Sequence, residues 1–137
     1  MFQKNAQALL DFIEKSPCSY QVIETMKNDL EAAGFCRLQE QNPWKLQAGG
    51  AYYVTRNDSS LIAFRMPENR EFRGFQIIAS HSDSPALRVK ENPALGAEGC
   101  YIRLNTEKYG GMIHSTWLDR PLSVAGRLTV REMKDGQ

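Results

Sequence analysis

A short apolar segment that ends in polar residues most constrains what this chain can fold into. Residues 75–80 (FQIIAS) are mainly apolar or β-branched and are bounded by turn formers. This pattern predicts a buried β-strand. The strand would end at the sequence HSDSP of residues 81–85. It would therefore present an imidazole and a carboxylate, two residues apart, at the end of a buried element.

The pairing of His81 with Asp83 suits a metal site. A neutral imidazole nitrogen ligates a metal ion, and a nearby carboxylate accepts the other ring N–H and so fixes the tautomer. This interpretation makes His81 a metal ligand and Asp83 its support. The alternative is a strand followed by an ordinary Asp-Ser-Pro turn, with His81 merely polar at its mouth. The spacing of two residues leaves both interpretations open.

Composition describes an ordinary globular protein and excludes several classes of partner. The chain has 137 residues, a formal net charge of +1 and 42% hydrophobic residues. Its balanced charge gives no reason to expect nucleic acid or a membrane as partner. We see no apolar signal segment and no membrane-spanning stretch, and the three cysteines are widely spaced. We therefore expect a cytoplasmic protein whose thiols are reduced.

The first part of the chain predicts two helices. Apolar residues recur at helical spacing over residues 5–15, and the Ser-Pro pair at 16–17 ends that segment. Ser19 is a suitable N-cap for a second helix, whose apolar stripe reaches Ala33. Gly34 stands where a glycine would end it. We interpret both helices as packing elements on one face of a sheet.

The strand pattern begins after the helices. Residues 51–55 and 61–64 read as two strands joined by a polar connection, and residues 75–80 would add a third. Helices followed by such a sheet predict the α/β class. Residues 87–90 and 101–104 alternate as half-buried strands do, and an apolar-rich stretch covers 122–130.

The change of pattern predicts two domains. We place residues 1–92 in an α/β domain and residues 93–137 in a β-rich one. The chain ends in Lys-Asp-Gly-Gln at 134–137, and Asp-Gly is a strong signal for a hairpin turn. Because this turn has no strand after it, we expect the chain to be truncated.

Four stretches, in one order, carry a resemblance to a known family. They are FIEKSPCSY (12–20), GGAYYVTRNDSSLIAF (49–64), ASHSDSPALRVK (79–90) and YGGMIHSTWLDRPLSVAGR (109–127). Together they resemble the N-terminal portion of the aspartyl aminopeptidase family, the M18 zinc metallopeptidases. The resemblance implies that residues 1–92 are the N-terminal part of a zinc-peptidase α/β sandwich. It implies that residues 93–137 begin a β-rich dimerisation domain.

The resemblance also implies a function. Members of the family use a metal-activated water to release N-terminal, often acidic, residues from peptides. The metal ligand of their His-x-Asp segment maps onto His81, and the supporting catalytic Asp maps onto Asp83. The complete site would hold two zinc ions, although imidazole and carboxylate ligands also suit cobalt or manganese. The full-length protein would form homo-oligomers.

The same resemblance limits what this chain would do alone. The further carboxylate ligands, the general base and the last His ligand of the family would lie beyond Gln137. A catalytic zinc takes three protein ligands, and this chain offers one convincing ligand, His81. We therefore expect an inactive fragment of a metalloaminopeptidase.

Two other functions stay open at this point. The chain could be a non-catalytic module that serves assembly. It could also belong to a serine hydrolase that uses Ser82 or Ser84 with His81, although neither serine lies in a Gly-x-Ser-x-Gly elbow. The other histidine, His114, departs from the family pattern, and we interpret it as a structural or surface residue.

Overall fold

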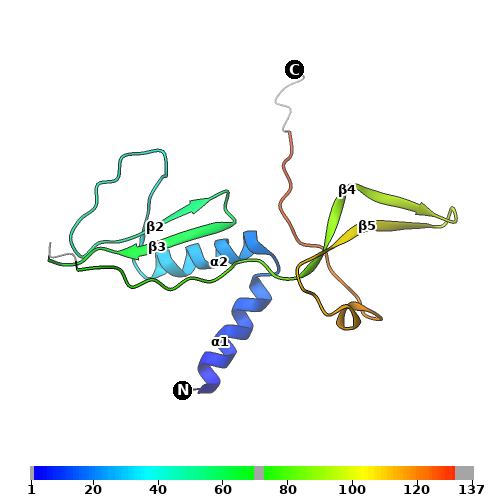
Figure 1. Cartoon of the computed structure of the whole chain (residues 1–137), viewed down its shortest axis with the longest axis horizontal. Helices are drawn as coiled ribbons and strands as arrows, with labels where there is room; N and C mark the ends of the chain where they lie inside the picture. The colour runs from blue at the N-terminus through cyan, green and yellow to red at the C-terminus, as the bar shows by residue number, and fades with distance from the viewer. Residues whose placement is uncertain (1, 70–72, 132–137) are drawn as a thin grey trace. The chain divides into compact units, whose positions relative to one another are not determined.

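The computed structural model describes residues 2–69 and 73–131, and the chain forms two units. The first unit comprises residues up to Ser82 together with those from Ala125 on, and the second comprises Asp83–Val124. Figure 1 shows two helices and a small sheet in the first unit and a long β-ribbon in the second. In the described part of the chain, no helix has both the length and the apolar character to cross a membrane.

The two predicted helices are present. Helix α1 spans Phe2–Lys15 and α2 spans Ser19–Ala32. The prediction that Ser19 is the N-cap is wrong by one residue. The backbone is still extended at Cys18, with φ −148° and ψ 171°, so Cys18 is the N-cap. Its side chain makes no capping bond to the backbone, and its thiol instead donates to Gln21 Oε1 at 2.6 Å.

Gly34 ends α2 as predicted, and its backbone explains why a glycine stands there. Its φ is +81°, in the left-handed region that favours glycine. The Gly34 N–H donates to the Glu31 carbonyl at 3.0 Å, and the Phe35 N–H donates to the Leu30 carbonyl at 2.9 Å. These two bonds form a Schellman motif, which satisfies carbonyls at the end of the helix.

A three-stranded sheet, in the order β1-β2-β3, lies against α2. Strand β1 (Cys36–Arg37) pairs in parallel with β2 (Ala51–Arg56), which pairs antiparallel with β3 (Ser60–Arg65). Tyr53 is fully buried at the centre of this sheet, and its hydroxyl donates to the Glu31 carboxylate on α2. Ile23 of α2 is also buried. The core of the first unit therefore lies between α2 and one face of the sheet.

The aromatic side chains of the sheet's other face pack under the loop that precedes β2. Tyr52 and Phe64 are register partners, with ring centroids 5.7 Å apart, and Trp44 stacks on Phe64 at 6.1 Å. The Tyr52 hydroxyl accepts a hydrogen bond from the Gln47 N–H at 2.9 Å. The loop is thus held by stacking and by one buried tyrosine oxygen.

The second unit is a twisted β-ribbon with a short helix. Strand β4 (Ala86–Ala97) pairs antiparallel with β5 (Tyr101–Tyr109), with a register shift between Val89 and Ala94. A 3₁₀ helix, η1, covers His114–Trp117. The expected domain boundary between residues 92 and 93 falls inside β4, whereas the units meet at 82/83 and 124/125.

The strand predicted over residues 75–80 does not form in the described chain, and the apolar-rich stretch 122–130 forms no strand either. Residues 75–80 and 122–130 have no regular secondary structure, and the side chains of Ile77 and Ile78 are 80% and 102% exposed. A strand needs a neighbour to complete its backbone hydrogen bonds, and the described residues supply a ladder only to β1–β3 and to β4–β5. The strand prediction for residues 75–80 is therefore wrong for this chain.

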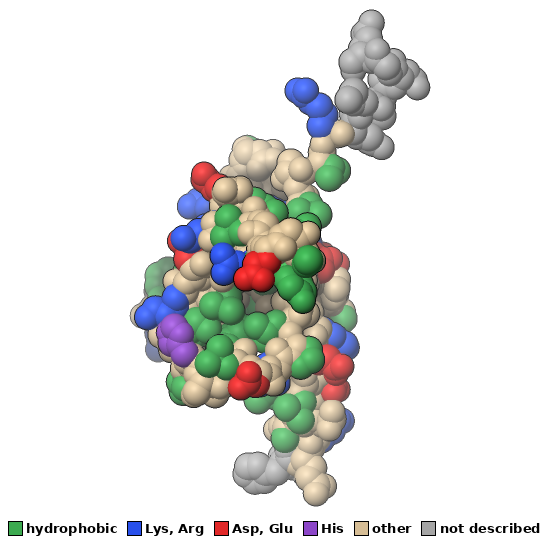
Figure 2. Space-filling view, turned by 90° about the vertical axis from the view of Figure 1, so that its right-hand side faces the viewer, with side chains coloured by type: hydrophobic (Ala, Val, Ile, Leu, Met, Phe, Trp, Pro, Cys, Tyr) green, Lys and Arg blue, Asp and Glu red, His purple; other side chains and the backbone are tan. Residues whose placement is uncertain are grey.

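Helix α1 also leaves its apolar stripe open. Leu9, Leu10 and Ile13 are each more than half exposed, so the expectation that α1 buries this face is not met. Figure 2 shows hydrophobic side chains open on the surface. The predicted turn at 134–137 lies outside the described residues.

Candidate functional site

His81 lies near the end of the first unit, in an exposed segment without regular secondary structure. The next residue, Ser82, is half-buried and donates from Oγ to the Ser59 carbonyl at 2.8 Å. Ser59 follows β2 in the turn that leads to β3. A side-chain bond therefore holds the backbone beside His81 on the β2–β3 turn.

Asp83 has a partner that the sequence analysis missed. It begins the second unit, and its carboxylate oxygen Oδ2 accepts a 2.6 Å hydrogen bond from the hydroxyl of Tyr109, at the end of β5. This hydrogen bond, followed by the negative charge of Asp83, raises the pKa of Tyr109 above its ordinary value of 10.0.

A glycine keeps these two segments close together. Gly110 has φ +73°, and a Cβ placed on it would lie 3.4 Å from Pro85 Cα. A larger residue would meet both a strained backbone and a tight contact. The segment of Asp83 and Pro85 is thus held beside the end of β5. In the sequence, the only signal for this role of Tyr109 is its position within the family-like stretch 109–127.

The structure disfavours Ser82 as a nucleophile. A serine hydroxyl has one proton, and that of Ser82 is donated to a backbone carbonyl. An activated serine instead donates that proton to a general base. The hydrogen bond gives Ser82 a positioning role beside His81.

The residues that the structure describes do not make a complete zinc site. In the described ranges 2–69 and 73–131, no three His, Cys, Asp or Glu side chains gather closely enough to hold a metal ion. A catalytic zinc takes three protein ligands and keeps one position open. Cys18, Cys36 and Cys100 are free thiols, and two of them are exposed. The proposed pairing of His81 with Asp83 stays a prediction.

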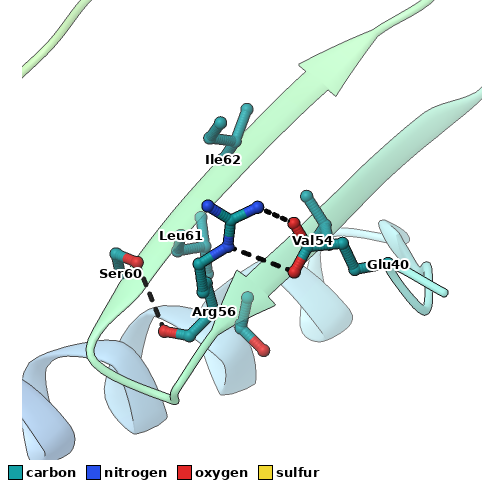
Figure 3. A pocket seen from close by; sticks show the side chains of 7 residues that line it. Glu40, Val54, Arg56, Ser60, Leu61 and Ile62 are labelled. Atoms are coloured by element: carbon teal, nitrogen blue, oxygen red, sulfur yellow. Dashed lines mark hydrogen bonds and ion pairs between the residues drawn. The ribbon is translucent and has the colours of Figure 1, made fainter.

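A shallow depression of about 230 Å³ lies on the sheet, and Figure 3 shows the residues that line it. Arg56 points its guanidinium at the Glu40 carboxylate and forms an ion pair with it. The hydrogen bond from Arg56, aided by its charge, lowers the pKa of Glu40. The other lining residues are Val54, Thr55, Ser60, Leu61 and Ile62. Because its two charged groups neutralise each other and it holds no imidazole or thiol, this depression is a poor catalytic candidate.

The chain matches a known protein family. The model of the family described as Aminopeptidase I zinc metalloprotease (M18) matches residues 12–137. A probable M18 family aminopeptidase 2 of Clostridium acetobutylicum is 50% identical over 127 residues, which is 92% of this chain and 29% of the relative. Its counterpart in Clostridium novyi is 47% identical over 93% of this chain and 30% of the relative.

The chain is also similar to solved structures. The structure titled as the Ape4 and Nbr1 complex matches with a TM-score of 0.80 and 42% identity, over 84% of this chain and 22% of that chain. The S. cerevisiae mApe1 dodecamer matches with a TM-score of 0.78 and 32% identity, over 87% of this chain and 28% of that chain. The chain thus spans less than a third of the length of these relatives and structures.

Proposed function

The chain belongs to the M18 family of aminopeptidases, and from this premise we propose that it is the N-terminal part of a metal-dependent aminopeptidase. The reaction is the release of N-terminal residues, often acidic ones, from peptides. The observation that carries this proposal is that the family match runs through residues 12–137 and so includes the His-Ser-Asp segment. Residues outside this chain supply the rest of the active site, and the 137-residue chain alone is inactive.

We assign His81 as the metal ligand that this chain contributes. His81 is exposed, and the Ser82 hydrogen bond to Ser59 restrains the backbone beside it. Asp83 is assigned as the carboxylate that supports His81, and its hydrogen bond to Tyr109 orients that carboxylate. The metal is zinc, with two ions in the complete site.

We further propose that the complete protein is a homo-oligomer and that residues 93–137 begin its dimerisation domain. The dodecameric state of the yeast mApe1 structure supports the first part. The β-ribbon supports only a separate β-rich part of the chain, because it lies outside the α/β unit; the unit that holds it, Asp83–Val124, begins before residue 93 and ends before residue 137.

A chimaera tests this function. Residues 1–137 would replace the matching N-terminal part of the Clostridium acetobutylicum relative, and hydrolysis of a peptide with an N-terminal acidic residue would be measured in the presence of zinc. We expect activity. We also expect His81→Ala to reduce kcat/KM more than about 100-fold, since the loss of a ligand weakens metal binding.

The other histidine supplies the matched control. His114→Ala should leave kcat/KM of the chimaera within about twofold, because His114 is exposed at the start of η1. A folded chimaera that hydrolyses no peptide would overturn the proposed function. Unchanged activity of His81→Ala with saturating zinc would overturn only the ligand assignment.

A further inference from the structure

One turn receives both segments by which the chain leaves and re-enters the first unit. The chain leaves this unit after Ser82 and returns at Ala125. On the way out, Ser82 Oγ donates to the Ser59 carbonyl at 2.8 Å. On return, Arg127 Nη1 donates to the Asn57 carbonyl at 2.9 Å, and Nη2 donates to Asn57 Oδ1 at 2.8 Å. Asn57 and Ser59 belong to the same β2–β3 turn.

The β2–β3 turn is built to hold its acceptors in place. Asn57 and Asp58 have φ values of 53° and 49°, and the Ser59 N–H donates to the Arg56 carbonyl at 3.2 Å. Two successive positive φ angles are typical of the tight turns that suit hairpin twist, and Asn and Asp tolerate them. Thr55 Oγ1 also donates to Asp58 Oδ1 at 3.3 Å. The acceptor oxygens are therefore oriented by a constrained backbone.

Arg127 fits this turn in a way that a lysine would not. The two arms of its guanidinium bond to two oxygens of one residue, Asn57. Its Cζ lies 4.4 Å from the centroid of the Tyr20 ring, at the start of α2. A planar, forked cation makes both contacts at once, whereas an ammonium is a point charge. Arg127 thus joins α2, the turn and the returning segment.

We propose that the β2–β3 turn is the common anchor of both crossing segments, and that Ser82 and Arg127 are the positioning residues that act through it. Ser82 follows His81 directly, so the anchor holds the segment that carries the candidate ligand. The consequence for metal binding rests on the proposed function, whereas the anchor itself does not. Arg127 is the last residue of the family-like stretch 109–127.

Hydrogen exchange of the 137-residue chain tests the anchor without any metal. We expect Arg127→Gln to increase exchange of the Ser59 amide about tenfold, because this amide donates to the Arg56 carbonyl within the turn and the turn loses one of its supports. Arg127→Lys should do nearly the same, since it keeps the charge but loses the fork. The control is Arg131→Gln, in the same exposed segment, which should change exchange less than about twofold.

A double-mutant cycle tests whether the turn is shared. If Ser82→Ala and Arg127→Gln act through one turn, their effects on its exchange will be less than multiplicative when combined. Multiplicative effects, or an Arg127→Gln effect confined to residues 125–131, would overturn the proposal. Asn57→Asp, which keeps an acceptor at the same place, should preserve the wild-type exchange.

The chimaera separates this inference from the proposed function. Ser82→Ala should raise the zinc concentration for half-maximal activity about tenfold, as loss of a group that orients a ligand does. Ser84→Ala, two residues further on, should not. The chimaera could be active and lose activity with His81→Ala, yet show the same zinc concentration for half-maximal activity with and without Ser82→Ala. That result would overturn only the anchor's role at His81. If hydrogen exchange shows the anchor but the folded chimaera has no peptidase activity, only the proposed function is overturned.

Discussion

The Tyr109 hydroxyl donates a 2.6 Å hydrogen bond to the Asp83 carboxylate, and so joins the first residue of the second unit to the end of β5. Asp83 is the residue that the sequence nominates to support His81. Its orientation is constrained within the β-ribbon unit, by a phenol 26 residues further along the chain. The orientation of Asp83 therefore depends on a residue of a strand that is distant in the sequence.

The first prediction concerns this pair. Asp83→Asn should lower the pKa of Tyr109 towards 10, because the hydrogen bond to the carboxylate and its charge raise that pKa in the wild-type chain. The Tyr109 ring carbon signals, followed by NMR between pH 8 and 12, measure the shift. Ser84→Ala is the control, since it leaves the carboxylate in place. An unchanged Tyr109 titration in Asp83→Asn would contradict the bond.

The second prediction concerns alkaline pH. Burial, followed by the bond to Glu31, raises the pKa of Tyr53 from 10.0 to about 12. Between these pH values, Tyr53 of the unfolded chain loses its proton before Tyr53 of the folded chain. The free energy of unfolding of the first unit should therefore fall as pH rises from 10 to 12.

Tyr53→Phe tests that slope. It should cost about 1 kcal/mol at neutral pH, through the lost hydrogen bond, and should flatten the decline above pH 10. Urea titrations followed by Trp44 fluorescence, in a Trp117→Phe background, report on the first unit. Tyr101→Phe is the control, because Tyr101 is 71% exposed in the other unit. An equal decline in Tyr53→Phe and wild type would assign the slope to another group.

The third prediction concerns the end of α2. Gly34→Ala should destabilise the first unit by roughly 1 kcal/mol, the cost of a left-handed backbone in a residue with a Cβ. Apart from its two chain neighbours, no residue has an atom within 4 Å of the place where that Cβ would stand, so the cost is in the backbone. Gly34→Asn should cost less, because Asn tolerates this conformation. Equal losses for both variants in thermal unfolding would argue against this cause.

The fourth prediction concerns zinc. Calorimetric titration of the 137-residue chain with zinc alone should show weak binding, because one imidazole cannot replace the three protein ligands of a catalytic site. His81→Ala should weaken the residual binding further, and His114→Ala should have less effect. Tight, stoichiometric zinc binding would mean that the 137-residue chain holds a complete site of its own. It would contradict the proposal that residues outside this chain supply the remaining ligands.

The fifth prediction compares two isoleucines. Ile78→Ala should change the stability of this chain by less than about 0.5 kcal/mol, since Ile78 is fully exposed. Ile23→Ala should cost about 2–5 kcal/mol, because Ile23 is 2% exposed beneath the sheet. In the chimaera, Ile78→Ala should become costly if residues 75–80 pair as a strand there. Chemical denaturation of both proteins decides between these outcomes.

Local signals in the sequence predicted the elements that depend on neighbouring residues. The helical periodicity located α1 and α2, and Gly34 ended α2 where a left-handed residue was needed. The polar connection between residues 55 and 61 joined two strands as predicted, because its Asn and Asp accept positive φ. The Ser19 cap failed by one residue because the N-cap is Cys18, whose side chain makes no capping bond, so no capping preference in the sequence marks it.

The features that the sequence did not predict depend on contacts between distant residues. The apolar run at residues 75–80 has the composition of a strand, but composition does not supply a hydrogen-bonding neighbour, so the run stays exposed here. Likewise, no periodicity joins Tyr109 to Asp83, or Arg127 to Asn57, across 26 and 70 residues.

By itself, the sequence determined the helices, the hairpin, the α/β class and the M18 family, because each depends on local patterns or on motifs in a set order. It also singled out His81 and Asp83 as the chemical candidates. Only the tertiary structure decided what surrounds them. Ser82 is held on the β2–β3 turn, and Asp83 is held by Tyr109, since hydrogen bonds between distant residues form only when the chain has folded.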